Sequence, residues 1–137
     1  MLKSLFSSPR ASVLEQSLAA ASLRHKIISN NIANVNTPNF KKSEVVFESF
    51  LQNALNENKL ALANTNNKHI SLKQSLVSSK PQVSTVTNTT MRTDGNNVDI
   101  DVEMAELAKN NIYYNAVAQQ LGNYFSGLKS VINEGKR

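Results

Sequence analysis

Side chains that commonly carry out chemistry are few in this chain of 137 residues. There is no cysteine, so disulfide frameworks, thiolate metal sites and thiol nucleophiles are excluded. The two histidines, His25 and His69, are too few for a multi-histidine metal site within one chain. The sequence contains neither a glycine-rich phosphate loop nor the common nucleophile and zinc-protease motifs. We therefore expect no enzymatic activity, no metal and no cofactor.

Acidic residues gather between positions 94 and 103, where we considered a calcium-binding loop. An EF-hand loop needs a glycine at its sixth position and a glutamate at its twelfth, but Gly95 follows Asp94 directly. Capping of a helix start, where carboxylates interact favourably with the helix dipole, explains these acids better. His25 falls on the apolar side of a predicted helix, which favours a packed histidine over a ligand or a base.

The chain is basic, with 15 Lys and Arg against 10 Asp and Glu and a pI near 9.6. Such a charge permits contact with nucleic acid or an anionic membrane surface. The basic pairs Lys41–Lys42 and Lys136–Arg137 have no interleaved aromatics apart from Phe40, so a base-stacking platform is lacking. A basic helical nucleic-acid-binding protein remains the alternative function. No stretch approaches the ~18 apolar residues of a membrane span, and we expect no cleavable secretory signal.

Asparagines crowd the segment Ser29–Phe40, near the end of a predicted helix. Asparagine is a poor residue for a helix interior because its side chain competes for backbone hydrogen bonds. One interpretation is a fraying helix end followed by a turn. The other is a strip of amides, each able to donate and accept, that docks against neighbouring helices.

The first predicted helix starts at Ser8–Pro9, where serine caps the helix and proline occupies its first position. It ends near Asn36, because Pro38 disfavours a helical conformation at Thr37. Along it, positions repeat at spacings of four and three, which is typical of a helix seam. The seam consists of Leu14, Leu18, Ala21, His25, Ile28, Ile32 and Val35.

The last predicted helix spans about Asp99 to Glu134, with Asn97 or Asp99 as its cap. The same alternation of spacings continues along its whole length. Its seam consists of Ile100, Met104, Leu107, Asn111, Tyr114, Ala118, Leu121, Phe125, Leu128 and Ile132.

The fold class is therefore mainly α: two long terminal amphipathic helices packed as an antiparallel coiled-coil-like hairpin. A short third helix is predicted from about Glu44 to Glu57. Residues 1–57 and 91–137 would form the helical core domain, and residues 58–90 a flexible or small β-containing insert. In an antiparallel pair His25 lies roughly level with Asn111, and a contact between these two polar seam residues would fix the register.

Both apolar stripes are wider than a two-helix pair can cover. Uncovered apolar surface on this scale implies a partner, and for a single chain the commonest partner is another copy or a relative. We expect a helical unit that polymerises.

The segment SNNIANVNTPNFK, residues 29–41, resembles the signature of flagellar basal-body rod and hook proteins, which reads close to ANNIANxNTPGYK. Two departures are Asn39 in place of the usual glycine and Phe40 in place of tyrosine. The segment beginning at Arg92, RTDGNNVDID, and the short chain length are similar to the proximal-rod members of this family. The signature positions that we expect at subunit interfaces are Asn30, Asn31, Ile32, Ala33, Asn34, Asn36, Thr37 and Pro38.

This resemblance implies a bacterial structural protein of the flagellar basal body, exported by the flagellar type III apparatus into the periplasmic rod. Its terminal helices would polymerise into a tube that transmits torque and lines the export channel. The implied partners are copies of itself, other flagellar rod proteins, the rod–ring adaptor protein, the membrane-ring protein and the flagellar export gate. The resemblance implies neither nucleic acid nor a small-molecule substrate.

Overall fold

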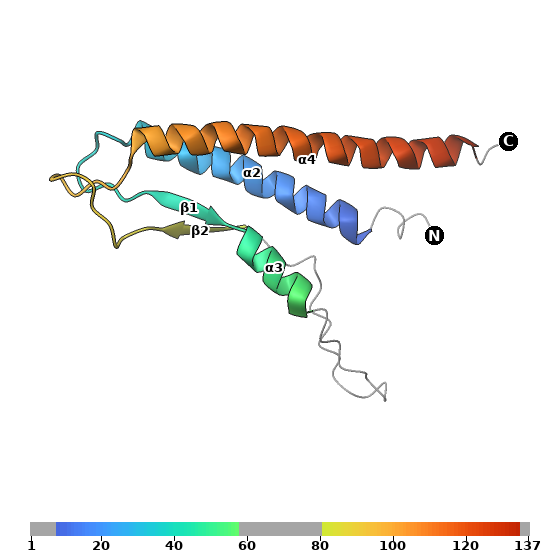
Figure 1. The fold of residues 1–137 in the computed structure, drawn as a ribbon, viewed down its shortest axis with the longest axis horizontal. Helices are drawn as coiled ribbons and strands as arrows, with labels where there is room; N and C mark the ends of the chain where they lie inside the picture. Colours follow the sequence, from blue (N-terminus) through green and yellow to red (C-terminus); the bar gives the residue numbers. More distant parts are fainter. Residues whose placement is uncertain (1–7, 58–80, 135–137) are drawn as a thin grey trace, which may run out of the picture.

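The structure, a computed structural model, describes residues 8–57 and 81–134 of the chain. Its elements, in chain order, are α2 (Pro9–Ala33), β1 (Ser43–Val46), α3 (Glu48–Glu57), β2 (Gln82–Thr85) and α4 (Ile100–Glu134). The mainly helical class is confirmed, with a long helix towards each end of the chain and a short helix between them (Figure 1). Most of the predicted insert, residues 58–80, lies outside the described residues.

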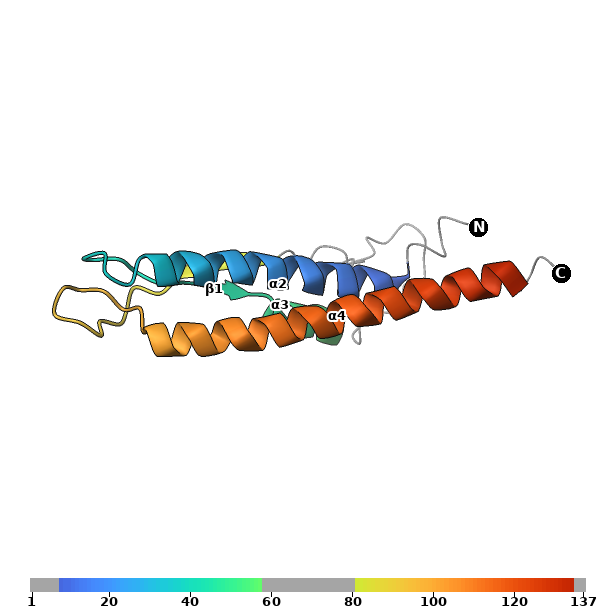
Figure 2. The ribbon, with the colours of Figure 1, turned by 90° about the horizontal axis from the view of Figure 1, so that it is seen from above.

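The two long helices lie side by side and run in opposite directions (Figure 2). Asn31 near the end of α2 bonds to Glu103 near the start of α4, at 3.1 Å. At the other end the Tyr124 hydroxyl donates to Ser8 Oγ at 2.8 Å. Contacts between opposite chain positions at both ends establish the antiparallel hairpin that the sequence predicts.

Both long helices begin as their sequences predict. Ser8 Oγ accepts a hydrogen bond from the Ala11 amide at 3.2 Å, and Pro9 follows the cap. Asp99 Oδ1 accepts from the Asp101 amide at 3.0 Å at the start of α4. A side-chain acceptor satisfies a backbone donor that the first helical turn leaves without a partner.

The short helix is confirmed, but its predicted start at Glu44 is wrong. Residues 43–46 form β1, and α3 begins at Glu48. Consecutive β-branched valines, Val45 and Val46, favour the extended chain, and Val45 is buried. β1 pairs with β2 in antiparallel register, with Val45 opposite Val83. β2, which lies within the predicted insert 58–90, therefore pairs with the segment just after α2.

The two-stranded sheet and α3 lie on one side of the helix pair, as Figures 1 and 2 together show. Phe47, between β1 and α3, is 1% exposed and is the largest of the fully buried side chains. On the α2 side of the helix contact, the small residues Ala20 and Ala21 are fully buried. Small side chains at the contact allow the two helix axes to approach closely.

The buried stripe of α4 is not its most apolar one. The buried positions, Glu103, Asn110 and Val117, recur every seven residues. The predicted seam lies to one side of them, and Met104 within it is 53% exposed. Among the residues that the structure describes, no helix has the combination of length and apolarity that crossing a membrane requires.

Candidate functional site

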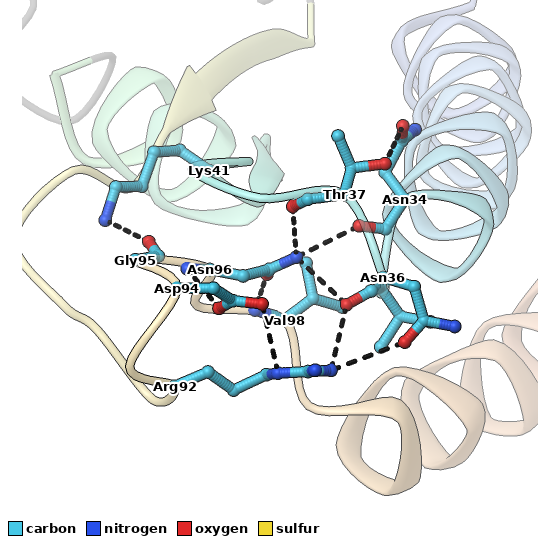
Figure 3. Close-up of polar contacts among 10 residues, drawn as sticks. Asn34, Asn36, Thr37, Lys41, Arg92, Asp94, Gly95, Asn96 and Val98 are labelled. Carbon is cyan, nitrogen blue, oxygen red and sulfur yellow. Dashed lines mark hydrogen bonds and ion pairs between the residues drawn. The ribbon is translucent and has the colours of Figure 1, made fainter.

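Three buried asparagines organise the end of the hairpin where α2 stops and α4 begins. They belong to a polar network between residues 31–43 and 86–98, which we call the asparagine junction. Asn96, at its centre, is fully buried. Its amide nitrogen donates to the carbonyls of Asn34, Val35 and Thr37 at 3.0, 3.0 and 2.9 Å (Figure 3).

The oxygen of this side-chain amide completes the turn that leads into α4. Asn96 Oδ1 accepts from the Val98 amide at 2.7 Å, and Asp94 Oδ1 accepts from the Asn96 amide at 3.2 Å. One side chain thus bonds to carbonyls of the turn that follows α2 and shapes the start of α4. The contact ties this turn to a distant part of the chain.

Asn97 and Asn31 extend the junction towards the sheet. Asn97 Nδ2 donates to the Val86 carbonyl at 2.7 Å, and its Oδ1 accepts from the Lys42 amide at 2.7 Å. Asn31 pairs with both backbone groups of Ser43, at 2.9 and 3.1 Å. Because an asparagine amide both donates and accepts, it can replace a backbone group in such pairs.

Two basic side chains lie at different edges of the junction, Lys41 at the upper left and Arg92 at the bottom of Figure 3. Arg92 donates to the Val35 carbonyl at 3.3 Å and forms an ion pair with Asp94 at 3.4 Å. Lys41 Nζ donates to the Gly95 carbonyl at 2.8 Å and to the Thr89 carbonyl at 3.1 Å. Both cations are therefore engaged with backbone oxygens of the junction.

Two residues with positive φ lie against each other in the junction. Asn39 has a φ of 59° and Gly95 a φ of 81°. The Asn39 amide donates to the Asp94 carbonyl at 2.9 Å. A Cβ atom at Gly95 would lie 2.7 Å from Asn39 Oδ1, so that side chain would have to shift, and the positive φ itself favours glycine. Asparagine tolerates the left-handed conformation at position 39, where the family signature has glycine.

Charged pairs also hold the sheet and α3 near the helix pair. Arg24 of α2 binds both carboxylate oxygens of Glu48 at 2.8 Å. Partial burial opposes ionisation of Glu48, but the hydrogen bonds from Arg24 and the backbone outweigh it and hold the Glu48 pKa below its ordinary value. The hydrogen bond to Glu44, at 2.7 Å, raises the pKa of Lys42 against the opposing effect of burial.

The expected signature residues divide into two groups. Asn31, Asn34 and Thr37 take part in the junction through side chains or carbonyls, and Asn36 Oδ1 accepts from Arg92 at 3.4 Å. The others face partly or wholly outward: Asn30, Ala33 and Pro38 are exposed and Ile32 is half-buried. The amide strip thus bonds within the chain, to the segment around Asn96, and the helix end is a defined turn.

The predicted seam residues gather along the helix pair without being buried throughout. Ala21 and Ile28 are buried, whereas His25 and Asn111 are exposed. The half-buried seam residues are Leu14, Leu18, Ile32, Val35, Leu107, Ala118, Leu121 and Leu128. Those that remain exposed on α4, besides Asn111, are Ile100, Met104, Tyr114, Phe125 and Ile132.

His25 and Asn111 line one shallow depression of about 240 Å³. Within the described part of the chain, no hydrogen bond joins their side chains. The interhelical hydrogen bond at this level comes from the neighbouring residue, Asn110, which donates to the Ala21 carbonyl at 2.9 Å. The expected register contact between His25 and Asn111 is therefore replaced by one between Asn110 and the Ala21 backbone, one residue earlier on α4 and four residues earlier on α2.

The sequence gives only part of the junction. Asp94 to Asn97 is a recognisable turn, and the segment from Arg92 belongs to the quoted family motif, but no local signal pairs Asn96 with carbonyls some 60 residues earlier. Glu103 and Asn110 escape a search for apolar spacing because they are polar. Among described residues, no group of three or more His, Cys, Asp or Glu side chains is suited to hold a metal.

Comparison with known proteins identifies the same region. A family model described as flagella basal body rod protein matches residues 13–41, which include most of α2 and the signature. The chain is 36% identical over 123 residues to the flagellar basal body rod protein FlgB of Bacillus subtilis, covering 90% of this chain and 92% of the relative. It is 41% identical to FlgB of Borreliella burgdorferi, over 84% of this chain and 89% of the relative. The identity to FlgB of Aeromonas hydrophila is 31%, over 83% and 85%.

Proposed function

The chain belongs to the FlgB family of flagellar basal body rod proteins, and on this premise we propose that it polymerises in the proximal rod through the faces of its two long helices. It is a structural rod subunit and not an enzyme. The proposal concerns how the subunit assembles, which residues make the contacts and which partners they meet.

One observation carries this proposal: apolar side chains of α4 stay exposed along the full length of an otherwise fixed hairpin. Ile100, Met104 and Ile132 mark the two ends of this stripe, and each is more than two-fifths exposed. The β1–β2 sheet lies on one side of the helix pair (Figure 2). The side chains of the stripe stay exposed in the described chain. Burial against neighbouring helices would stabilise the assembly at about 25 cal/mol per Å² of apolar surface removed from water.

The junction supports this assembly by fixing the angle and register of the helix pair before contact. Its buried amides have their partners within the chain, so they are structural and do not supply the contact surface. The outward-facing signature residues Asn30, Ala33 and Pro38 would meet neighbouring subunits at that end of the molecule.

In this proposal the subunit lies in the periplasmic rod, after export by the flagellar type III apparatus. It contacts copies of itself and other rod proteins, the rod–ring adaptor protein, the membrane-ring protein and the export gate. Residues 1–57 and 91–137 supply the rod core, with residues 58–90 as an insert. Many shared helix contacts transmit torque around the export channel.

The nucleic-acid-binding alternative has no support from the family. The geometry also argues against it, because the adjacent cations Lys41 and Lys42 are engaged by backbone carbonyls and by Glu44. Such internal pairing leaves less charge for phosphate contacts.

A pair of matched charge substitutions tests the contact face. Met104→Asp places a charge on the stripe, at a side chain 53% exposed, and Ile112→Asp places the same charge on α4 at a side chain 73% exposed and off the stripe. Since neither side chain is buried, both variants should keep the helix content of the wild type. Met104→Asp should reduce recovery in isolated basal bodies, and motility, at least tenfold, whereas Ile112→Asp should leave both near wild type. Normal incorporation of Met104→Asp would contradict the assigned face.

A further inference from the structure

Helix α4 continues beyond the start of its partner helix, as Figure 1 shows. The hydrogen bond between Tyr124 and Ser8 marks where α2 begins. The residues of α4 after this point, 125–134, form what we call the overhang, about 15 Å of helix. The face of α4 that packs against α2, at Glu103, Asn110 and Val117, continues into the overhang at seven-residue steps. On this face Val117 is 7% exposed, but Val131 is 71% exposed.

The overhang presents apolar side chains at the spacing that helix-binding grooves recognise. Phe125, Leu128 and Ile132 stand at i, i+3 and i+7, with Val131 beside them. Phe125, Val131 and Ile132 are all exposed in the described chain. This short helical face therefore lacks the cover that α2 gives to the rest of α4.

A groove of about 650 Å³ lies at the other end of α4, between α2, β1 and α4. This size is in the range of ligand-binding clefts. Ile28 and Val45 give it a buried apolar floor, and Val102 and Tyr113 of α4 line it as well. Charged residues of all three elements surround that floor.

The charges of the groove favour a basic occupant. Arg24, Lys42 and Lys109 form ion pairs with glutamates of the groove. Glu103, a further glutamate lining it, is 5% exposed and has only the Asn31 amide as a bonded partner among the described residues. By formal count the groove thus has four glutamates against three basic residues. The sequence from the overhang onward carries Lys129, Lys136 and Arg137 against Glu134.

We propose that the overhang of one subunit docks into the α2–β1–α4 groove of a second copy. Shape and charge support the match: an apolar helical face with a basic end meets an apolar floor with an acidic excess. The two surfaces lie at different ends of α4, so the contact is head-to-tail and can continue from subunit to subunit. This inference rests on the proposed function, since it names one contact by which the rod subunit polymerises.

A cysteine-free chain allows a direct test by disulfide formation. The variant carrying both Val102→Cys and Val131→Cys places one thiol in the groove and one on the overhang. About 43 Å of straight helix separates the two positions, so they cannot form a disulfide within one chain. After mild oxidation of isolated basal bodies, the double variant should give a ladder of dimers and higher oligomers on a non-reducing gel. Each single variant should give no ladder.

The control variant keeps Val131→Cys on the overhang and replaces Val102→Cys by Ile112→Cys, which lies on α4 outside the groove lining. An equal ladder from this control would overturn the proposal, because the contact would then lack specificity. A double variant that incorporates normally but forms no ladder would also overturn it, while leaving the proposed function intact. Absence of the wild-type chain from basal bodies would instead overturn the proposed function.

The alternative is that the start of the same chain covers the overhang. The variant Leu5→Cys with Val131→Cys tests this, since residues 1–7 precede α2. A disulfide within one chain of this variant, together with no ladder from the groove variant, would overturn docking between copies.

Discussion

The two ends of the helix pair are stabilised in opposite ways. At the asparagine junction, buried polar groups are matched by partners from the same chain, as the three carbonyls bound by Asn96 illustrate. At the overhang, apolar groups such as Val131 remain exposed, and within residues 8–57 and 81–134 no second helix accompanies α4. One end is complete within the subunit, and in the proposed assembly the other would acquire its partners from neighbouring subunits.

This difference follows from the physics of the two kinds of surface. Buried amides without partners are costly, so a polar junction has to be satisfied in the folded monomer. Exposed apolar surface is tolerated in the monomer and becomes favourable when a partner removes it from water. Substitutions at the junction should therefore act on subunit stability, whereas substitutions at the overhang should act on assembly.

The largest effect is expected from Asn96→Ala. The change removes the donor to three carbonyls and the acceptor for the Val98 amide, all near the buried centre of the junction. Leaving buried polar groups without partners should lower the free energy of unfolding by about 3 kcal/mol. Urea denaturation followed by circular dichroism measures the loss. Asn123→Ala, at an exposed position of α4, is the control and should change stability by less than about 0.5 kcal/mol.

Replacing one glycine at each of two places by alanine should change the stability of the fold in opposite directions. Gly95→Ala in the junction forces a Cβ against Asn39 Oδ1 at positive φ and should cost about 1–2 kcal/mol. Gly122→Ala in α4 meets no atom within 4 Å and should stabilise the helix by about 0.5–1 kcal/mol. Thermal unfolding of both variants checks the signs. Equal effects would show that the junction is looser than its contacts indicate.

The helices were predictable because their signals are local. Ser8–Pro9, Asp99 and the regular apolar spacing mark the ends and lengths of α2 and α4 within each segment. The start of α3 was misplaced because the same spacing analysis overlooked the extended preference of Val45 and Val46. There the strand is stabilised by pairing with residues 82–85, which no local pattern reveals.

The contact face of α4 was harder to predict for a physical reason. A search for apolar periodicity selects Met104 and Tyr114, whereas the helix pair buries Glu103 and Asn110. These polar residues are accommodated because Asn31 and the Ala21 carbonyl bond to them across the interface. Polar burial depends on the partner, and the partner comes from the other end of the chain. The asparagine junction was missed as an internal network for the same reason.

The smallest effect is expected where α3 is tied to the stable part of the molecule, through Arg24 and Glu48. Because the Glu48 pKa is held below its ordinary value of 4.5, the ion pair stabilises the fold above that pH and is lost as the pH falls through the lowered pKa. The Glu48 side chain is 58% exposed, so solvent screening limits the contribution of the ion pair to stability to about 0.5 kcal/mol. Glu48→Gln and Arg24→Gln should each lower stability at pH 7 and reduce the difference between pH 7 and pH 3. In a double-mutant cycle followed by urea denaturation, the two changes should be less than additive at pH 7 and additive at pH 3. An absence of coupling at pH 7 would show that Arg24 holds α3 mainly through the Val45 carbonyl, 3.5 Å away, and not through the carboxylate.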